Sequence, residues 1–336
     1  MCIRDSFYRA DYDITPKNRL TATEFYTSGQ ANELSNDCPI NCTNAGNTAI
    51  TAQVSDVWTF SADMNNEFRA GLSTQNNLYI PQTIGQGYPA KLGIQWAKAD
   101  LFPEVNINGV WGFGPGTNAI QHQTMIEPSD VVTVVKGKHI LHFGGEFLAM
   151  QVNATNWGNV DAGATNFTGA YTENWTPATC SNPSFPGQAC PDTNTGLAYA
   201  DFLLGQVNSW SATNTPEFYT RYKSLQGFVQ DDIKIRPNFT FNAGLRWEGW
   251  TPNHEKYGNS RLFDPTIVNP GVNPFGVVNT LGAMWYGTTH TNGRMDDISS
   301  IWNIFLPRFG ASWQARPNMV VRGAIGLYAY LSLIHI

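Results

Sequence analysis

The sequence is poor in charge and has no long apolar run. Lys, Arg, Asp and Glu make up 14% of the 336 residues, against about 25% in an average globular protein. No apolar stretch reaches the roughly 18 residues of a membrane-spanning helix, which excludes a helical membrane protein. Acidic residues exceed basic ones by 26 to 20, so the basic surplus of a general nucleic-acid binder is absent and no nucleic-acid partner is expected. The bias of long coiled coils toward Ala, Glu, Lys and Leu is also missing.

Aromatic and turn-forming residues are abundant instead. The chain has 11 Trp, 13 Tyr and 19 Phe, together with 31 Gly and 19 Pro. Disordered chains are poor in aromatic residues, so disorder is excluded. A composition that is rich in aromatic residues and turns is typical of an all-β protein.

Apolar and polar side chains alternate with a period of two in three hairpins. From 225 to 235 the odd positions are mainly apolar and the even ones mainly polar, and 239–248 repeats the pattern after the turn Arg236-Pro237-Asn238. The same unit recurs over 308–329, and a third hairpin pivots at Lys136-Gly137-Lys138. Such alternation predicts antiparallel strands with one apolar face.

The expected strands are nine to eleven residues long, which suits an apolar band of about 25 Å crossed at about 45°. Tight turns close one end of each hairpin, and the connections over 151–200 and 248–308 are long and polar. Short turns on one rim and long loops on the other are typical of an antiparallel transmembrane β-barrel. A soluble β-sandwich with ordinary core packing is the alternative.

The alternation also predicts which side chains face which way. The polar side, which would line the barrel lumen, carries Lys234, Arg246, Glu248, Arg308 and Arg322. The apolar side, which would contact lipid, carries Phe239, Phe241, Leu245, Trp247, Phe309, Trp313, Val321, Ile325 and Leu327.

The two ends of the chain, residues 1–6 and 331–336, are predicted to be cloning scars. One short DNA sequence, read on opposite strands, encodes both hexapeptides, and it resembles the transposon-end adapter of sequencing libraries. Residues 7–330 are therefore expected to be the native segment, a fragment of a longer protein, and Cys2 is set aside with the scar.

Four cysteines then remain, in two polar segments. Cys38 and Cys42 lie in one segment, and Cys180 and Cys190 lie in the other. An even count in the loops of an exported protein predicts two local disulfides, with free thiols as the alternative. No His lies at ligand spacing from either pair, so we expect no metal and no cofactor.

Asp231, Asp232 and Glu248 raise the question of a glycosidase, in which two carboxylates share the acid and base roles. Adjacent residues of a strand point to opposite faces, so Asp231 and Asp232 cannot act together. The chain is therefore not expected to be an enzyme.

Six segments, in order, resemble the barrel of TonB-dependent outer-membrane receptors, especially the Oar-like group. They are Asn66–Gly71, Lys136–His139 with Phe143–Phe147, Ala200–Gly205, Gln230–Asp232 through Gly244–Glu248, Pro307–Gly310 and Val321–Ala324.

The resemblance implies about 10 strands of a 22-stranded barrel in a Gram-negative outer membrane. Such a receptor takes up a scarce solute (a siderophore, a vitamin or a glycan) with energy delivered by the TonB complex. Its lumen is filled by an N-terminal plug, which the lumen-facing charges would contact. The plug, the TonB box and about half of the barrel are missing, so this fragment alone is not expected to transport. Outer-membrane lipid, the plug, the TonB complex and a small solute are the implied partners.

Solute contacts in such a receptor come from loop aromatic residues, and the sequence does not choose among Trp157, Trp175, Trp210 and Trp285. A secreted glycan-binding β-sandwich and an adhesin barrel without a transport role are the alternatives. A partial barrel would leave a curved antiparallel sheet with both edges unpaired.

Overall fold

The computed structural model describes most of the chain. The described residues are 2–32, 38–95, 97–114, 118–155, 162–176, 190–191, 195–213, 217–272, 276, 278–286, 296 and 299–329.

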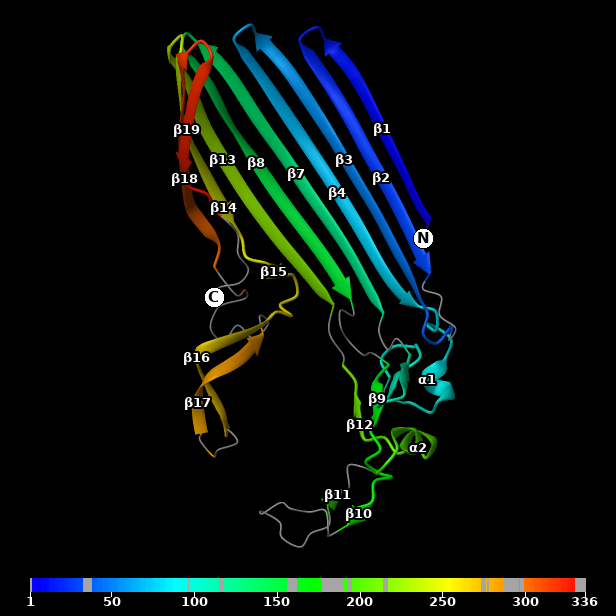
Figure 1. Cartoon of the computed structure of the whole chain (residues 1–336). Helices are drawn as coiled ribbons and strands as arrows, with labels where there is room; N and C mark the ends of the chain where they lie inside the picture. The colour runs from blue at the N-terminus through cyan, green and yellow to red at the C-terminus, as the bar shows by residue number, and fades with distance from the viewer. Residues whose placement is uncertain are drawn as a thin grey trace.

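One large antiparallel sheet dominates the molecule. Its ten long strands follow the order β1-β2-β3-β4-β7-β8-β13-β14-β18-β19, and a short strand, β15, pairs with β13 as well. The long strands are β1 (Cys2–Thr15), β2 (Asn18–Asn32), β3 (Thr43–Ser61), β4 (Met64–Pro81), β7 (Ala119–Lys136), β8 (His139–Thr155), β13 (Phe218–Arg236), β14 (Phe239–Trp250), β18 (Ile301–Arg316) and β19 (Met319–Gly326). Figure 1 shows them side by side, with β1 and β19 at the two edges. The predicted open antiparallel sheet of about 10 strands is confirmed.

The two rims of this sheet differ as predicted. Two-residue turns at 16–17, 62–63, 137–138, 237–238 and 317–318 join the strands of each hairpin at one rim. All of them lie at the upper end of the sheet in Figure 1, and the long connections emerge at the other end. Gly137 adopts φ 62° in its turn, a backbone angle that favours glycine.

The strands are longer than the nine to eleven residues that alternation predicts. β3 and β13 each have 19 residues, and β4 and β7 each have 18. β13 begins at Phe218, well before the alternating stretch, and its first residues already pair with β8. Backbone pairing continues where the side-chain pattern fades, because the hydrogen-bond ladder does not need an apolar face.

A β-sandwich would bury the apolar side chains of its sheets in a compact core. The apolar side chains of the large sheet form no such core. Ile325 is 76% exposed, Trp313 49% and Leu245 42%. The buried hydrophobic cluster lies at the loop end instead and consists of Phe102, Val105, Ile107, Phe167 and Ala198. The large sheet therefore presents two uncovered faces.

The segments at the loop end contain short elements. A four-stranded sheet has the order β12-β9-β5-β6, and two smaller sheets are β10-β11 and β16-β17. The bounds are α1 (Tyr88–Lys91), β5 (Glu104–Ile107), β6 (Trp111–Phe113), β9 (Ala164–Phe167), β10 (Trp175–Thr176), β11 (Cys190–Pro191), α2 (Ala198–Leu203), β12 (Ser209–Ser211), β15 (His254–Glu255), β16 (Arg261–Val272) and β17 (Val278–Tyr286). Neither helix of the described part is long and apolar enough to span a membrane.

Candidate functional site

The register of the large sheet gathers the five predicted charged residues on one face, which we call the polar face. Gly244 pairs with Arg308, and Ser312 pairs with Arg322. Across β13 and β14, Lys234 pairs with Thr240. Thr240 and Glu248 lie an even number of residues from Arg246 on β14, so Lys234, Arg246 and Glu248 share one side of the sheet. Residues that pair across strands share a face, so one surface collects these side chains from four strands.

Hydrogen bonds tie part of the polar face together. Arg246 Nε donates to Glu248 Oε1 at 2.8 Å. The Asp232 carboxylate accepts hydrogen bonds from Gln230 Nε2 at 2.9 Å and Asn242 Nδ2 at 2.6 Å. Such charged groups are satisfied within the sheet itself.

Three of the predicted cations are not neutralised in this way. Among the described residues, Lys234, Arg308 and Arg322 form no ion pair. The Arg308 guanidinium lies 4.7 Å from the centre of the Tyr328 ring. Arg322 borders a shallow hollow of about 550 Å³ that Asn242 also lines. The polar face therefore retains positive charge that a covering segment could contact.

The opposite surface, the apolar face, carries the predicted hydrophobic residues. Across β14, β18 and β19 the register aligns Phe239 with Trp313 and Val321 in one row, and Phe309 with Ile325 in another. Phe241, Leu245 and Trp247 alternate with the polar-face residues of β14. Leu327 follows the end of β19 and donates its backbone N–H to the Pro307 carbonyl.

Three carboxylates interrupt the apolar face at a similar distance from the tight turns. Alternation along the single strands does not predict this row. Asp56, Asp130 and Asp231 pair with apolar-face positions of the neighbouring strands. Each has a polar partner nearer the turn: Asn18 Nδ2 donates to Asp56 at 3.3 Å, Asn66 Nδ2 donates to Asp130, and His139 Nδ1 lies 2.7 Å from Asp231. Asp231 and Glu248 lie on opposite faces, so they cannot form an acid and base pair.

Below the large sheet the loops form a small packed unit, which we call the loop subdomain and define as residues 38–42, 82–114, 162–172 and 195–213. Its core is the buried cluster of Phe102, Val105, Ile107, Phe167 and Ala198. Figure 1 shows α1, α2, β9 and β12 close together at this end of the sheet. Because it has its own core, this unit holds side chains in fixed positions.

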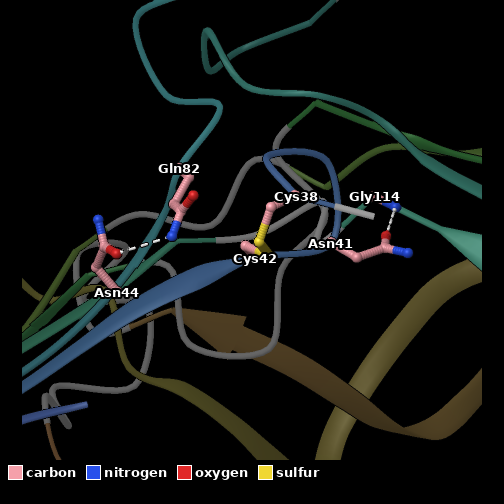
Figure 2. The surroundings of a disulfide bond; sticks show 6 residues. All are labelled: Cys38, Asn41, Cys42, Asn44, Gln82 and Gly114. Atoms are coloured by element: carbon pink, nitrogen blue, oxygen red, sulfur yellow. Dashed lines mark hydrogen bonds between the residues drawn. A yellow bond between two sulfur atoms is a disulfide. The ribbon is translucent and has the colours of Figure 1, made fainter. Parts of the chain in front are cut away.

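A disulfide and a hydrogen bond hold residues 38–42 within the loop subdomain, and a second hydrogen bond attaches the subdomain to β3 of the large sheet. Cys38 and Cys42 are joined by a disulfide with a Cα–Cα distance of 5.1 Å. Figure 2 shows the Gly114 N–H donating to Asn41 Oδ1 at 2.6 Å and Gln82 Nε2 donating to Asn44 Oδ1 at 3.1 Å. The segment before β3 is thereby connected to the segment that follows β6, and the start of β3 to the segment that follows β4.

A buried carboxylate holds another part of the subdomain. Asp201 on α2 is 0% exposed and accepts hydrogen bonds from Tyr171 N at 3.2 Å and Thr172 Oγ1 at 2.9 Å. Gly205 follows α2 with φ 68°, a conformation typical of a residue just beyond a helix end. The segment from Ala200 to Gly205, which resembles a family motif, includes the end of a short helix that the sequence pattern does not predict.

The four-stranded sheet of the loop subdomain has one face on the core and one face toward a hollow. Val105 and Ile107 are buried on the core side of β5, and Asn106 lies on the other side. Asn106 pairs with Asn166 of β9, which in turn pairs with Ser209 of β12. The hollow has a volume of about 520 Å³, and these three residues line it together with Trp111.

The structure describes only some of the remaining predicted site residues. Trp157 and Cys180 lie outside the described residues, as do the side chains of Trp175, Cys190 and Trp285. Trp210 is 60% exposed on β12, next to Ser209. Trp111 is not among the predicted solute contacts; it pairs with Ile107, which places its side chain on the core side of the four-stranded sheet.

No group of three or more His, Cys, Asp or Glu side chains suited to a metal ion occurs in the part of the chain that the structure describes.

Comparison with known proteins gives one family match. Residues 4–333 match a family model described as an outer membrane beta barrel domain. A search of curated proteins finds no match.

Several solved structures are similar in fold. The alcaligin outer membrane receptor FauA from Bordetella pertussis matches with a TM-score of 0.51 and 10% identity, over 96% of this chain and 34% of that chain. The open form of the ferric-catecholate import receptor Fiu from E. coli K12 gives 0.43 and 11%, over 95% and 46%. The outer membrane transporter YddB from Escherichia coli gives 0.44 and 10%, over 96% and 33%. The chain thus spans about a third of the length of FauA.

Proposed function

The chain belongs to the outer membrane beta barrel domain family and lies in the cell outer membrane, and on this premise we propose that it is part of the wall of a TonB-dependent receptor of the Oar-like group. The complete receptor takes up a scarce solute, such as a siderophore, a vitamin or a glycan. The role is transport and recognition, and no catalytic pair is assigned.

The observation that carries the proposal is the separation of side chains between the two faces of the large sheet. Charged residues from four strands share one face, while exposed Leu245, Trp313 and Ile325 lie on the other. In water an apolar surface of this extent would be unfavourable, whereas lipid accepts it. A charge facing lipid at mid-depth would cost about 2–4 kcal/mol, which accounts for the confinement of Arg246 and Arg322 to the polar face.

We assign the polar face to the lumen, where a plug domain of the complete receptor would cover it. The cations Lys234, Arg308 and Arg322 and the hollow beside Asn242 support this assignment, because acidic and polar groups of a plug would pair with them. The loop subdomain lies at the rim opposite the tight turns and would meet the solute first. The TonB complex would act on the plug from the other side.

The test uses the complete gene recovered from the source DNA. Expressed in a Gram-negative host, its product should enter the outer membrane and change gel mobility on boiling. Accumulation of its solute should stop when the proton gradient is dissipated or when TonB is deleted. Uptake that persists under both treatments would refute a TonB-dependent role. An upstream region without a plug would favour an adhesin barrel.

We also propose that residues 1–6 and 331–336 derive from a sequencing adapter and that residues 7–330 are native. Sequencing the source DNA without a transposon-based library tests this. Recovery of the same two hexapeptides in the native gene would refute it.

A further inference from the structure

The apolar face of β13 ends in basic side chains toward the loops. Val229 pairs with Leu245 and belongs to the apolar face, and Leu225 lies on the same side of the strand. The next two positions on that side are Lys223 and Arg221, and the pairing with β8 continues through them without a register shift. Lys223 is exposed and Arg221 is half-buried.

The segment around β15 adds a third cation on the same side. β15 lies at the loop end of the large sheet (Figure 1), where Glu255 pairs with Thr220 of β13. The backbone N–H of Lys256 donates to the Tyr219 carbonyl at 3.0 Å, which continues the antiparallel register by one residue. Lys256 is therefore opposite Tyr219 and shares a side with Arg221. We call Arg221, Lys223 and Lys256 the basic patch.

The basic patch lies where the apolar band should end. A charge that faces lipid is least costly near the borders of the band, so the acidic row of Asp56, Asp130 and Asp231 marks the border nearer the tight turns. On β13, Lys223 and Arg221 lie eight and ten residues beyond Asp231. At a rise of about 3.3 Å per residue and a tilt of about 45°, they are about 19 and 23 Å from that border, near the other edge of a band about 25 Å tall. Their long side chains can reach the headgroup level.

Neutral groups hold the cations of the basic patch. In the part of the chain that the structure describes, none of the three forms an ion pair. Arg221 Nη1 donates to Asn153 Oδ1 at 2.9 Å, and its guanidinium lies 5.9 Å from the centre of the Tyr219 ring. Lys256 Nζ lies 5.0 Å from the centre of the Tyr257 ring. These contacts orient the cations without neutralising them.

The carboxylates nearby interact with other donors. Asp296 Oδ1 lies 2.8 Å from His254 Nδ1, and the Tyr219 hydroxyl donates to Glu217. Glu255 is 3% exposed. Its carboxylate accepts hydrogen bonds from the backbone N–H groups of Tyr219, Tyr257 and Asn259. The charge of the basic patch therefore remains available to an anion from outside the chain.

We propose that the basic patch binds the phosphate groups of a phosphorylated glycolipid in the outer leaflet of the outer membrane, whose acyl chains lie along the apolar face at Leu225 and Val229. An Arg guanidinium matches the geometry of phosphate, and Lys adds a point charge. A lipid is favoured over free phosphate because the patch continues directly into the face that contacts lipid. The inference goes beyond uptake, and it rests on the orientation in the proposed function, with the long loops on the outer side of the membrane.

The test measures binding of diphosphoryl lipid A and of its dephosphorylated form to the complete gene product in detergent micelles, by native mass spectrometry. The diphosphoryl form should bind more tightly, and added salt should reduce the difference. Changing Arg221, Lys223 and Lys256 together to Gln should weaken its binding about 100-fold, or about fivefold for each cation, which corresponds to about 1 kcal/mol each. Lys136→Gln is the matched control and should leave the affinity unchanged, because Lys136 is also exposed and pairs with His139 on the same face, but at the rim of the tight turns.

Three results would overturn the assignment: equal affinity for the two forms, equal weakening by Lys136→Gln and by the triple change, or displacement of the glycolipid by inorganic phosphate at the same concentration. The mobility shift on boiling shows whether each variant is folded. If the triple variant does not fold, Lys223→Gln with Lys256→Gln decides, because both side chains are exposed, and it should weaken binding about 25-fold. A receptor that takes up its solute while lipid binding ignores the basic patch refutes this inference alone, whereas a product that does not enter the outer membrane refutes the proposed function.

Discussion

Placing an arginine at Leu72 tests the assignment of the apolar face to lipid. Leu72 is 41% exposed and lies between Ala52 of β3 and Ile126 of β7. Phe68, four residues earlier on β4, pairs with Asp56 and Asp130, so the acidic row marks the border of the apolar band nearer the turns. At a rise of about 3.3 Å per residue and a tilt of about 45°, Leu72 lies about 9 Å beyond this border, inside an apolar band about 25 Å tall.

The next residue, Ser73, provides a control at the same depth. It lies on the polar face, where its Oγ is 3.5 Å from Thr51 Oγ1. Leu72→Arg should lower the free energy of unfolding in lipid vesicles by about 2–4 kcal/mol, or about 30- to 700-fold in the equilibrium constant. Ser73→Arg should stay within about 0.5 kcal/mol, as is usual for exposed polar positions. Leu72→Ala measures the loss of apolar contact without added charge.

The assay is urea unfolding of the complete gene product in vesicles, followed by tryptophan fluorescence. Equal destabilisation by Leu72→Arg and Ser73→Arg would refute the reasoning, because a face that contacts lipid must discriminate against charge. Destabilisation by Ser73→Arg alone would mean that the two faces are assigned in reverse.

Three further predictions concern local packing. A Cβ at Gly144 would lie 2.3 Å from a backbone oxygen of β7, so Gly144→Ala should destabilise the sheet by about 1–3 kcal/mol in the same unfolding assay. A Cβ at Gly323 would meet nothing within 4 Å, so Gly323→Ala should change the free energy of unfolding by no more than about 0.5 kcal/mol. Equal destabilisation by Gly144→Ala and Gly323→Ala would contradict the close approach of β7 to Gly144. Asp201→Ala removes the acceptor of two buried hydrogen bonds and should lower the local stability of the loop subdomain by about 1–3 kcal/mol. Amide hydrogen exchange should then become faster in α2 and stay unchanged in the large sheet. Unchanged exchange in α2 would contradict this prediction. Reduction of the bond between Cys38 and Cys42 should speed exchange over 38–42 and leave the mobility shift on boiling intact, whereas loss of that shift would show that the disulfide supports the large sheet.

The hairpins of the large sheet could be predicted because their information is local. In the hairpin around Arg236-Pro237-Asn238, a period of two identifies both strands, and the proline marks the turn. Register then follows, because a slip of one residue would exchange the apolar and polar faces. The open sheet, the turn rim and the two faces of β14 were obtained in this way.

The ends of the strands and the acidic row could not be predicted in the same way. β18 begins at Ile301, although the alternation is clear only from Arg308. Asp231 occupies an apolar-face position because His139 of the neighbouring strand lies 2.7 Å away, and that partner is 92 residues distant in sequence. A pattern read along one strand contains no information on such a cross-strand contact.

The loop subdomain shows why a candidate binding site was harder to find than a barrel wall. Its row of Asn106, Asn166 and Ser209 depends on a parallel pairing between β5 and β9 and on a further antiparallel one, and no residue pattern in the loops specifies those partners. The sequence alone can offer only prominent tryptophans as candidate contacts, and it does not show which strands their segments pair with. The large sheet repeats one local rule across its hairpins, and the loops at the rim opposite the tight turns can diverge because their packing is specified by few long-range contacts. Recognition should accordingly differ between related barrels in the loop subdomain while the register of the large sheet is preserved.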